Sequence, residues 1–81
     1  MTEDGYAILE IWKNEMQPRF PYAELIGIKK SQIIIETSSS PGVQELTLRK
    51  REIINKINQY FGGRRVIRDI KVQIKGANSE K

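Results

Sequence analysis

The sequence predicts an α+β fold in two layers, with the order αββαβ and a three-stranded sheet that carries two helices on one face. Two segments, 5–16 and 41–61, repeat apolar residues at helical spacing, whereas a third, 66–75, alternates with a period of two. Two short runs rich in β-branched residues lie between the helical segments and are joined by polar residues, as in a hairpin. Three strands bury one face under two helices and leave the other face open.

The first helix is expected over residues 5–16, with Asp4 as its N-terminal cap. Its apolar face consists of Ile8, Leu9, Trp12 and Met16, with Ile11 at the edge. Pro18 and Pro21 end the helix, because proline lacks the amide and restricts the residue before it. Trp12, the chain's only tryptophan, is expected in the core rather than stacked on a base or a ligand.

The first two strands are expected over residues 22–28 and 33–37, with residues 29–32 as the hairpin connection. The second strand has the stronger signal, because the isoleucines at 33–35 are β-branched and suit a pleated surface. Side chains alternate between the two faces of a strand. Ile34 is therefore expected to be exposed, or to be covered by a partner or by another part of this chain.

The second helix is the centre of the prediction. Ser40 is expected to cap it, and Pro41 suits the first helical position, where a missing amide costs nothing. Its apolar stripe consists of Val43, Leu46, Ile53, Ile54, Ile57, Tyr60 and Phe61. Gly62 and Gly63 end the helix, since glycine reaches the left-handed conformation without a steric penalty. The closing strand at 66–75 alternates Val66, Arg68, Ile70, Val72 and Ile74 with Ile67, Asp69, Lys71, Gln73 and Lys75.

Length and composition predict one small domain at residues 1–75 and a disordered C-terminal tail at 76–81. The chain has no cysteine and no histidine, which excludes disulfides, thiolate zinc sites and histidine-based catalysis. It has no leader pattern and no apolar run of membrane-spanning length. We therefore expect a cytoplasmic protein without a metal, a cofactor or a membrane contact.

Charge is unevenly distributed along the chain. Residues 46–75 hold nine basic and two acidic groups, a net charge of +7, whereas residues 1–45 hold four basic and seven acidic groups, a net charge of −3. The last six residues cancel, so the total is +4. This segregation favours a polyanion on one side of the molecule, although a solvated basic face without a partner fits the charges equally well.

The candidate nucleic-acid-binding residues come from the basic half. Arg64 and Arg65 adjoin the flexible glycine corner and have the geometry to hold a phosphate between two hydrogen bonds, although a plain solvated helix end has the same sequence. Arg49 and Lys56 lie close in angle on the helix and are expected to join the basic residues of the last strand. The complete set is Arg49, Lys56, Arg64, Arg65, Arg68, Lys71 and Lys75.

The sequence offers no catalytic site. The carboxylates Glu36, Glu45, Glu52 and Asp69 are scattered among basic residues, as is typical of a surface. No nucleophile has a partner base, and no glycine-rich loop connects a strand to a helix as nucleotide binding requires. We therefore expect a binding module and not an enzyme.

A family likeness extends over about residues 8–75. The residues that carry it are Trp12, the hydrophobic hairpin, Pro41, Gln44-Glu45-Leu46, Lys50 to Ile54, Ile57-Asn58, Phe61-Gly62 and Val66 to Ile70. In these residues the chain resembles the DciA family, whose members are regarded as loaders of the bacterial replicative helicase DnaB. The resemblance implies a fold similar to the K-homology (KH) fold. Gly42 and Val43 stand where family members usually carry an aromatic residue, and the Gly-x-x-Gly loop of true KH domains is absent.

The resemblance and the basic half together predict a DNA-replication accessory protein. It would bind a DnaB-like helicase and single-stranded nucleic acid and assist helicase loading without hydrolysing ATP. Two alternatives remain open. A general RNA-binding KH-like module would need exposed aromatic residues for stacking, for which Tyr22 is the candidate. A protein–protein adaptor would use its charge for solubility alone.

Overall fold

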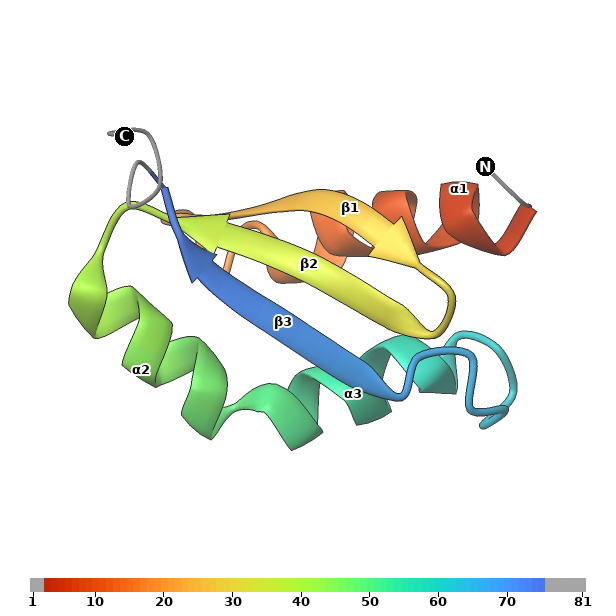
Figure 1. Cartoon of the computed structure of the whole chain (residues 1–81). Coiled ribbons are helices and arrows are strands. Elements are labelled where there is room, and N and C mark those ends of the chain that lie inside the picture. The colour runs from red at the N-terminus through yellow and green to blue at the C-terminus, as the bar shows by residue number, and fades with distance from the viewer. Residues whose placement is uncertain (1–2, 76–81) are drawn as a thin grey trace.

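The structure, a computed structural model, describes residues 3–75, so the expectation of a disordered tail at 76–81 lies outside the described residues. In chain order the elements are α1 (Glu3–Ile11), the π-helix η1 (Trp12–Met16), β1 (Ala23–Lys29), β2 (Gln32–Thr37), α2 (Ser40–Leu48), α3 (Lys50–Gln59) and β3 (Asp69–Ile74). The predicted α+β class and αββαβ order are confirmed, with each predicted helix divided into two pieces (Figure 1). This arrangement is compatible with a KH-like fold.

The strands form one mixed sheet in the order β1-β2-β3. β1 and β2 are antiparallel, and the two-residue turn at Lys30 and Ser31 joins them. β3 runs parallel to β2, so that Asp69 at the start of β3 lies opposite Gln32 at the start of β2. The hairpin turn and the loop that enters β3 therefore lie at the same end of the molecule, on the right of Figure 1.

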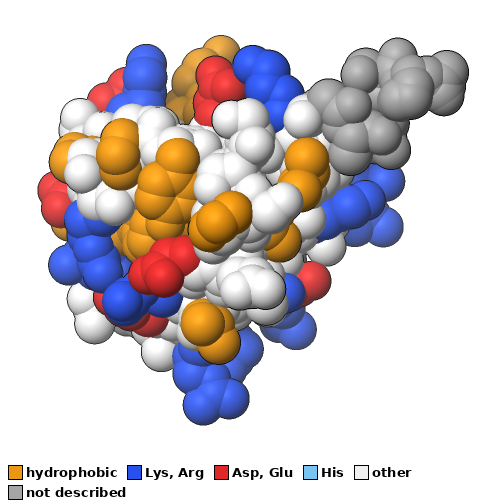
Figure 2. All heavy atoms as spheres, turned by 90° about the vertical axis from the view of Figure 1, so that its left-hand side faces the viewer, with side chains coloured by type: hydrophobic (Ala, Val, Ile, Leu, Met, Phe, Trp, Pro, Cys, Tyr) orange, Lys and Arg blue, Asp and Glu red, His pale blue; other side chains and the backbone are white. Residues whose placement is uncertain are grey.

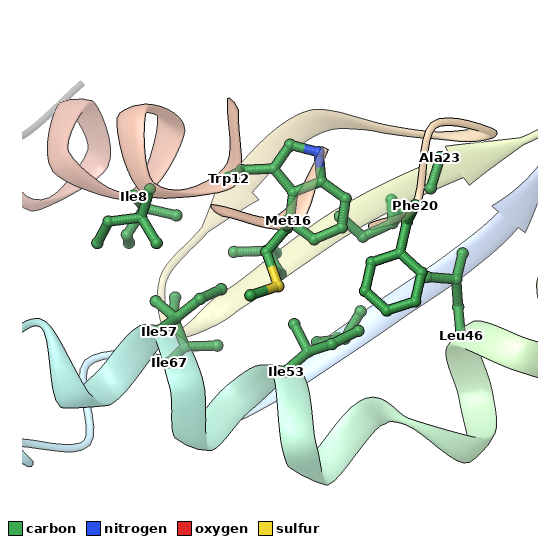
Figure 3. Packing of buried hydrophobic residues seen from close by; sticks show 13 residues of the cluster. Ile8, Trp12, Met16, Phe20, Ala23, Leu46, Ile53, Ile57 and Ile67 are labelled. Carbon is green, nitrogen blue, oxygen red and sulfur yellow. The ribbon is translucent and has the colours of Figure 1, made fainter. Parts of the chain in front are cut away.

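Both helical segments pack on one face of the sheet, as predicted. Figure 3 shows Trp12 and Met16 from η1 meeting Ile53 and Ile57 from α3 over the strands. The buried apolar cluster consists of Ile8, Ile11, Trp12, Met16, Phe20, Ala23, Ile33, Ile35, Leu46, Ile53, Ile57, Ile67 and Ile70. Trp12 is 1% exposed, which confirms that it is a core residue.

The open face of the sheet is covered only locally by its own side chains. Ile34 is partly buried and lies against Gly27, where an added Cβ atom would stand 3.5 Å from the Cδ1 atom of Ile34. The chain itself thus covers part of this side chain, which was one of the three expectations for Ile34. Ile26, beside a register shift between Leu25 and Gly27, is 46% exposed.

The turn after η1 is organised by Gln17. Its backbone amide donates to the carbonyl of Trp12 at 2.7 Å, which ends the π-helix. Its side-chain Oε1 accepts from the indole N–H of Trp12 at 3.1 Å, and its Nε2 donates to the carbonyl of Ala23 at 2.7 Å. One side chain therefore satisfies the buried indole and connects the helical layer to the first strand.

The starts of the two helical segments differ from the prediction. α1 begins at Glu3, so Asp4 lies inside the helix and not at its cap. The cap of α2 is Ser39, whose Oγ accepts from the Gly42 amide at 3.0 Å, so Ser40 is the first helical residue. Consecutive serines have equal capping chemistry, and the extended backbone of Ser39 decides between them.

The predicted continuous helix over 41–61 is broken at Arg49. There the backbone leaves helical geometry, with φ −98° and ψ 12°. No proline or glycine lies near this position to signal the break. Tyr60 was also predicted in the apolar stripe, but it follows the end of α3 and is 51% exposed. Partial burial, and next the negative charge of Glu15, raise the pKa of Tyr60 above its usual range.

The last strand begins later than predicted. The side-chain amide of Asn58 takes up both the N–H and the C=O of Ile67, each at 2.9 Å, so Ile67 does not join the strand ladder. Its side chain is completely buried, whereas the alternation had grouped it with the polar residues Asp69 and Lys71. Arg68 precedes the strand and is exposed, although the alternation had grouped it with Ile70. The Asn58 side chain of α3 thus takes the place of a neighbouring strand as the hydrogen-bond partner of Ile67, and the strand starts later for this reason.

Candidate nucleic-acid interface

The predicted basic residues do not form one surface. Arg64, Arg65 and Arg68 lie in the loop between α3 and β3, at the hairpin end of the sheet. Arg49, Lys56, Lys71 and Lys75 lie elsewhere, each in a different setting. Within the predicted set, Arg64, Arg65 and Arg68 are the three that share one loop.

Arg68 is joined to the β1–β2 hairpin by the backbone. Its N–H donates to the carbonyl of Ser31 at 2.7 Å, and the same oxygen accepts a second, longer bond at 3.3 Å from the N–H of Asp69. A shallow surface depression lies beside these bonds and is lined by Lys29, Lys30, Ser31, Gln32, Arg68 and Asp69. We call its three basic residues, Lys29, Lys30 and Arg68, the cationic notch.

Lys29 and Lys30 were missed as site residues, because they belong to the acidic half of the chain. Lys30 sits in the hairpin turn with φ 56°, a left-handed conformation that is uncommon outside glycine. Both side chains are exposed, as is Arg68. None of the three forms an ion pair with a carboxylate among the residues that the structure describes. Their charges are therefore available to a ligand in solution.

Arg64 and Arg65 extend the basic surface beyond the notch. Gly62 and Gly63 have φ of 70° and 85°, which confirms that they end the helix. The guanidinium carbon of Arg64 lies 6.0 Å from the centroid of the Phe61 ring, at the outer limit of a cation–π contact. Arg65 is exposed. Neither is ion-paired within the described part of the chain.

Asp69 is the carboxylate in the notch lining. Its pKa is held below its ordinary value by a hydrogen bond from the Ile70 amide and, next, by one from Gln32 at 3.2 Å. Lys50 Nζ lies 3.7 Å from its Oδ1. Asp69 is thus ionised at neutral pH, and Lys50 partly balances its charge.

Lys71 in β3 and Lys75 just after it do not line the notch. Lys71 is on the open face of the sheet, because Ile70 and Val72 on either side of it face the core. Lys75 follows the far end of the strand, where its N–H donates to the carbonyl of Thr37 at 2.7 Å. Lys75 is seven residues from Arg68, which at about 3.3 Å per residue separates them by roughly 23 Å. Figure 2 views this far end, where basic and acidic side chains are spread around the margin rather than gathered.

The two basic residues of the helices are also separate from the notch. Arg49 is paired with Glu45 and with Glu52, the latter at 3.1 Å, and its hydrogen bond to Glu45 is the main reason that its pKa is raised. Its charge is therefore used within the protein. Lys56 is partly buried on the outer side of α3, in a depression that it shares with Arg51.

The open face of the sheet is poorly suited to nucleic-acid bases. None of the three strands contains an aromatic residue, so the sheet offers no stacking platform. Tyr22, the candidate for stacking, meets the Phe20 ring edge-on at 6.1 Å and packs against Gly42. Burial raises its pKa above the usual range.

Two kinds of feature are absent from the described residues. Within 3–75, no group of three or more acidic residues is placed to hold a metal ion, and that range has neither histidine nor cysteine. In the same range, no helix has both the length and the apolar character needed to cross a membrane.

Comparison with known proteins identifies the family. The family described as "Dna[CI] antecedent, DciA" matches residues 3–72, from the first residue of α1 into β3. Curated proteins and solved structures gave no match. The matched range includes both helical segments, the hairpin and the loop that carries Arg64, Arg65 and Arg68. On this match over most of its length, the chain belongs to the DciA family.

Proposed function

We propose that this protein is a non-enzymatic accessory factor of DNA replication that binds a DnaB-like replicative helicase and assists its loading. The observation that carries the proposal is the family match over residues 3–72, because DciA proteins are regarded as helicase loaders. In this role ATP hydrolysis belongs to the helicase. The protein itself needs binding surfaces and no catalytic group.

The proposal includes contact with single-stranded nucleic acid. Its support is the exposed group Arg64, Arg65 and Arg68, which shares one end of the molecule and forms no ion pair among the described residues. Arginine suits phosphate because its planar guanidinium donates two parallel hydrogen bonds to one group. A loader that binds both the helicase and a single strand raises the local concentration of the strand near the helicase.

The direct experiment is a titration of isotope-labelled protein with purified replicative helicase, followed residue by residue in NMR. We expect a contiguous set of amide resonances to shift or broaden, and a pull-down by the helicase to survive nuclease treatment. A titration that leaves every amide unchanged would remove the helicase from the proposal. Loss of the pull-down after nuclease would reduce the contact to a shared nucleic acid.

The RNA-binding alternative has less support. It needs exposed rings on the open face of the sheet for base stacking, whereas the strands lack aromatic residues and the exposed tyrosines, Tyr6, Tyr22 and Tyr60, lie outside them. Competition between single-stranded RNA and single-stranded DNA of the same length separates the two functions. A marked preference for RNA would favour the alternative.

A further inference from the structure

We infer that the cationic notch, Lys29, Lys30 and Arg68, binds the phosphodiester backbone of single-stranded nucleic acid without reading its bases. This inference rests on the nucleic-acid part of the proposed function and names its centre. That centre lies on the β1–β2 hairpin and not along the last strand, where the charge pattern of the sequence had placed it.

The backbone of the cationic notch is preorganised. The Ser31 carbonyl accepts from the N–H groups of both Arg68 and Asp69, so the hairpin turn and the loop into β3 are held in one arrangement. Parallel pairing of Gln32 with Asp69 continues this connection into the sheet. The backbones that carry the three cations are therefore fixed before a ligand arrives, and binding has to order only the side chains.

The positive charges of the notch are free to attract a phosphate. The three basic side chains surround one depression, and they form no ion pair within the described range. A phosphate that enters gains their attraction without first breaking an ion pair inside the protein. Asp69 opposes an anion, but Lys50 at 3.7 Å and Gln32 at 3.2 Å already interact with its carboxylate. The notch therefore has a net positive charge, and its one carboxylate, Asp69, lowers its affinity for an anion.

The basic surface is longer than the notch, which suits a polymer as the ligand. Arg64 and Arg65 stand in the loop that leads to Arg68, so positive charge continues past the depression. A strand with successive phosphates engages both parts, whereas a lone phosphate engages one. Each additional contact releases bound counterions, which is the main source of affinity for nucleic-acid backbones.

The composition of the notch disfavours base reading. The notch lining contains no aromatic residue, and Gln32 uses its Nε2 to donate to Oδ2 of Asp69 at 3.2 Å. Stacking, a main means by which proteins recognise single-stranded bases, is therefore lacking in the notch. DNA and RNA strands offer it the same phosphodiester chemistry.

The test measures binding of a fluorescently labelled thymidine oligonucleotide to the full chain, by anisotropy, across a range of salt concentrations. The test variant is Lys29→Gln with Lys30→Gln, and the matched control is Lys13→Gln with Arg51→Gln, two exposed cations that do not line the notch. Both doubles remove the same charge from exposed positions. At about 0.1 M salt we expect the hairpin double to lose on the order of tenfold in affinity, and its salt slope to fall by about 0.7 for each lost contact.

The control double should stay within about twofold of the wild type and keep its salt slope. Equal losses in the two doubles would overturn the inference, because net charge alone would then explain binding. So would an unchanged affinity in the hairpin double. Thermal unfolding of each variant verifies that the fold is intact.

A second arm replaces the thymidine strand with an adenosine strand and with RNA of the same length. We expect similar affinities and the same response to the hairpin double. A strong preference for one base would overturn the claim that bases are not read. The helicase is absent from these binding assays, so a negative result would not count against the helicase contact. A negative helicase titration would likewise not count against nucleic-acid binding by the notch.

Discussion

The side chain of Asn58 forms a closed pair of hydrogen bonds with the backbone of Ile67. Its Nδ2 donates to the carbonyl and its Oδ1 accepts from the amide, both at 2.9 Å and both buried. This pair fastens the end of α3 to the approach to β3. The loop between them carries Arg64 and Arg65, so the Asn58 side chain holds the two ends of this loop together.

Replacing Asn58 by alanine should therefore destabilise the protein. The substitution leaves a buried N–H and a buried C=O of Ile67 without partners, at a cost of roughly 1–3 kcal/mol each. Urea denaturation followed by circular dichroism measures the change. Asn55→Ala on the exposed side of the same helix is the matched control and should change stability by less than about 0.5 kcal/mol. Similar losses in both variants would show that the hydrogen-bond pair is not what matters.

Arg64→Ala with Arg65→Ala should weaken binding to single-stranded DNA and flatten its salt dependence. Each phosphate contact removed lowers the salt slope by about 0.7. A titration of labelled oligonucleotide at several salt concentrations measures both effects. The comparison variant, Arg51→Ala with Lys56→Ala, removes the same charge from the outer side of α3. If the slope were unchanged in the first variant, these arginines would not be contacts.

Gly42→Ala should destabilise the fold by about 1–3 kcal/mol through overpacking. An added Cβ atom would stand 2.9 Å from Cδ1 of Tyr22 and 3.0 Å from Oγ1 of Thr37. Tyr22→Leu in the same chain should recover part of the loss by removing the ring. Gly27→Ala is the control, since its added Cβ atom would meet Ile34 at an ordinary 3.5 Å. Denaturation midpoints rank the variants, and equal effects at the two glycines would refute the steric explanation.

Glu52 should contribute a small pH-dependent stability. Hydrogen bonds from Arg19 first, and then from Arg49, hold the pKa of its carboxyl below the ordinary value of 4.5. Such a group stabilises the fold at pH values above the unfolded pKa, and the contribution is lost as pH falls through the folded pKa. The Arg19–Glu52 pair is largely solvated, with side chains 41% and 45% exposed, which keeps the effect small.

Acid titration of wild type and Glu52→Gln tests this expectation. The stability difference between them should be present at neutral pH and should vanish below the folded pKa of Glu52. Glu10→Gln is the control, because Glu10 is exposed and forms no ion pair among the described residues. A difference that stays constant down to low pH would mean that the charge of Glu52 plays no part.

The sequence was sufficient for the element order and for most of the core. Apolar spacing located both helical segments, and β-branched runs located the hairpin strands to within a residue. The errors have specific causes. Asn58 removed Ile67 from the strand by a hydrogen bond across nine residues, which no local pattern contains. The break at Arg49 has neither proline nor glycine to mark it.

The candidate site was less predictable than the fold. Charge counted along the chain grouped Lys71 and Lys75 with Arg68, although neither lines the notch and Lys75 lies at the other end of the sheet. It also assigned Lys29 and Lys30 to the acidic half. Residues distant in sequence become neighbours through strand pairing, and one-dimensional charge counts contain no information about pairing.

The direction of β3 is what decides which charges meet. Because it runs parallel to β2, the chain has to cross the molecule through α2 and α3 and return to the hairpin before the strand begins. Reversal of that one strand would bring Lys75 beside the hairpin and send Arg68 to the opposite end. The electrostatic polarity of the molecule is therefore a property of its topology, and grafting the hairpin or the loop alone onto another scaffold would not transfer it.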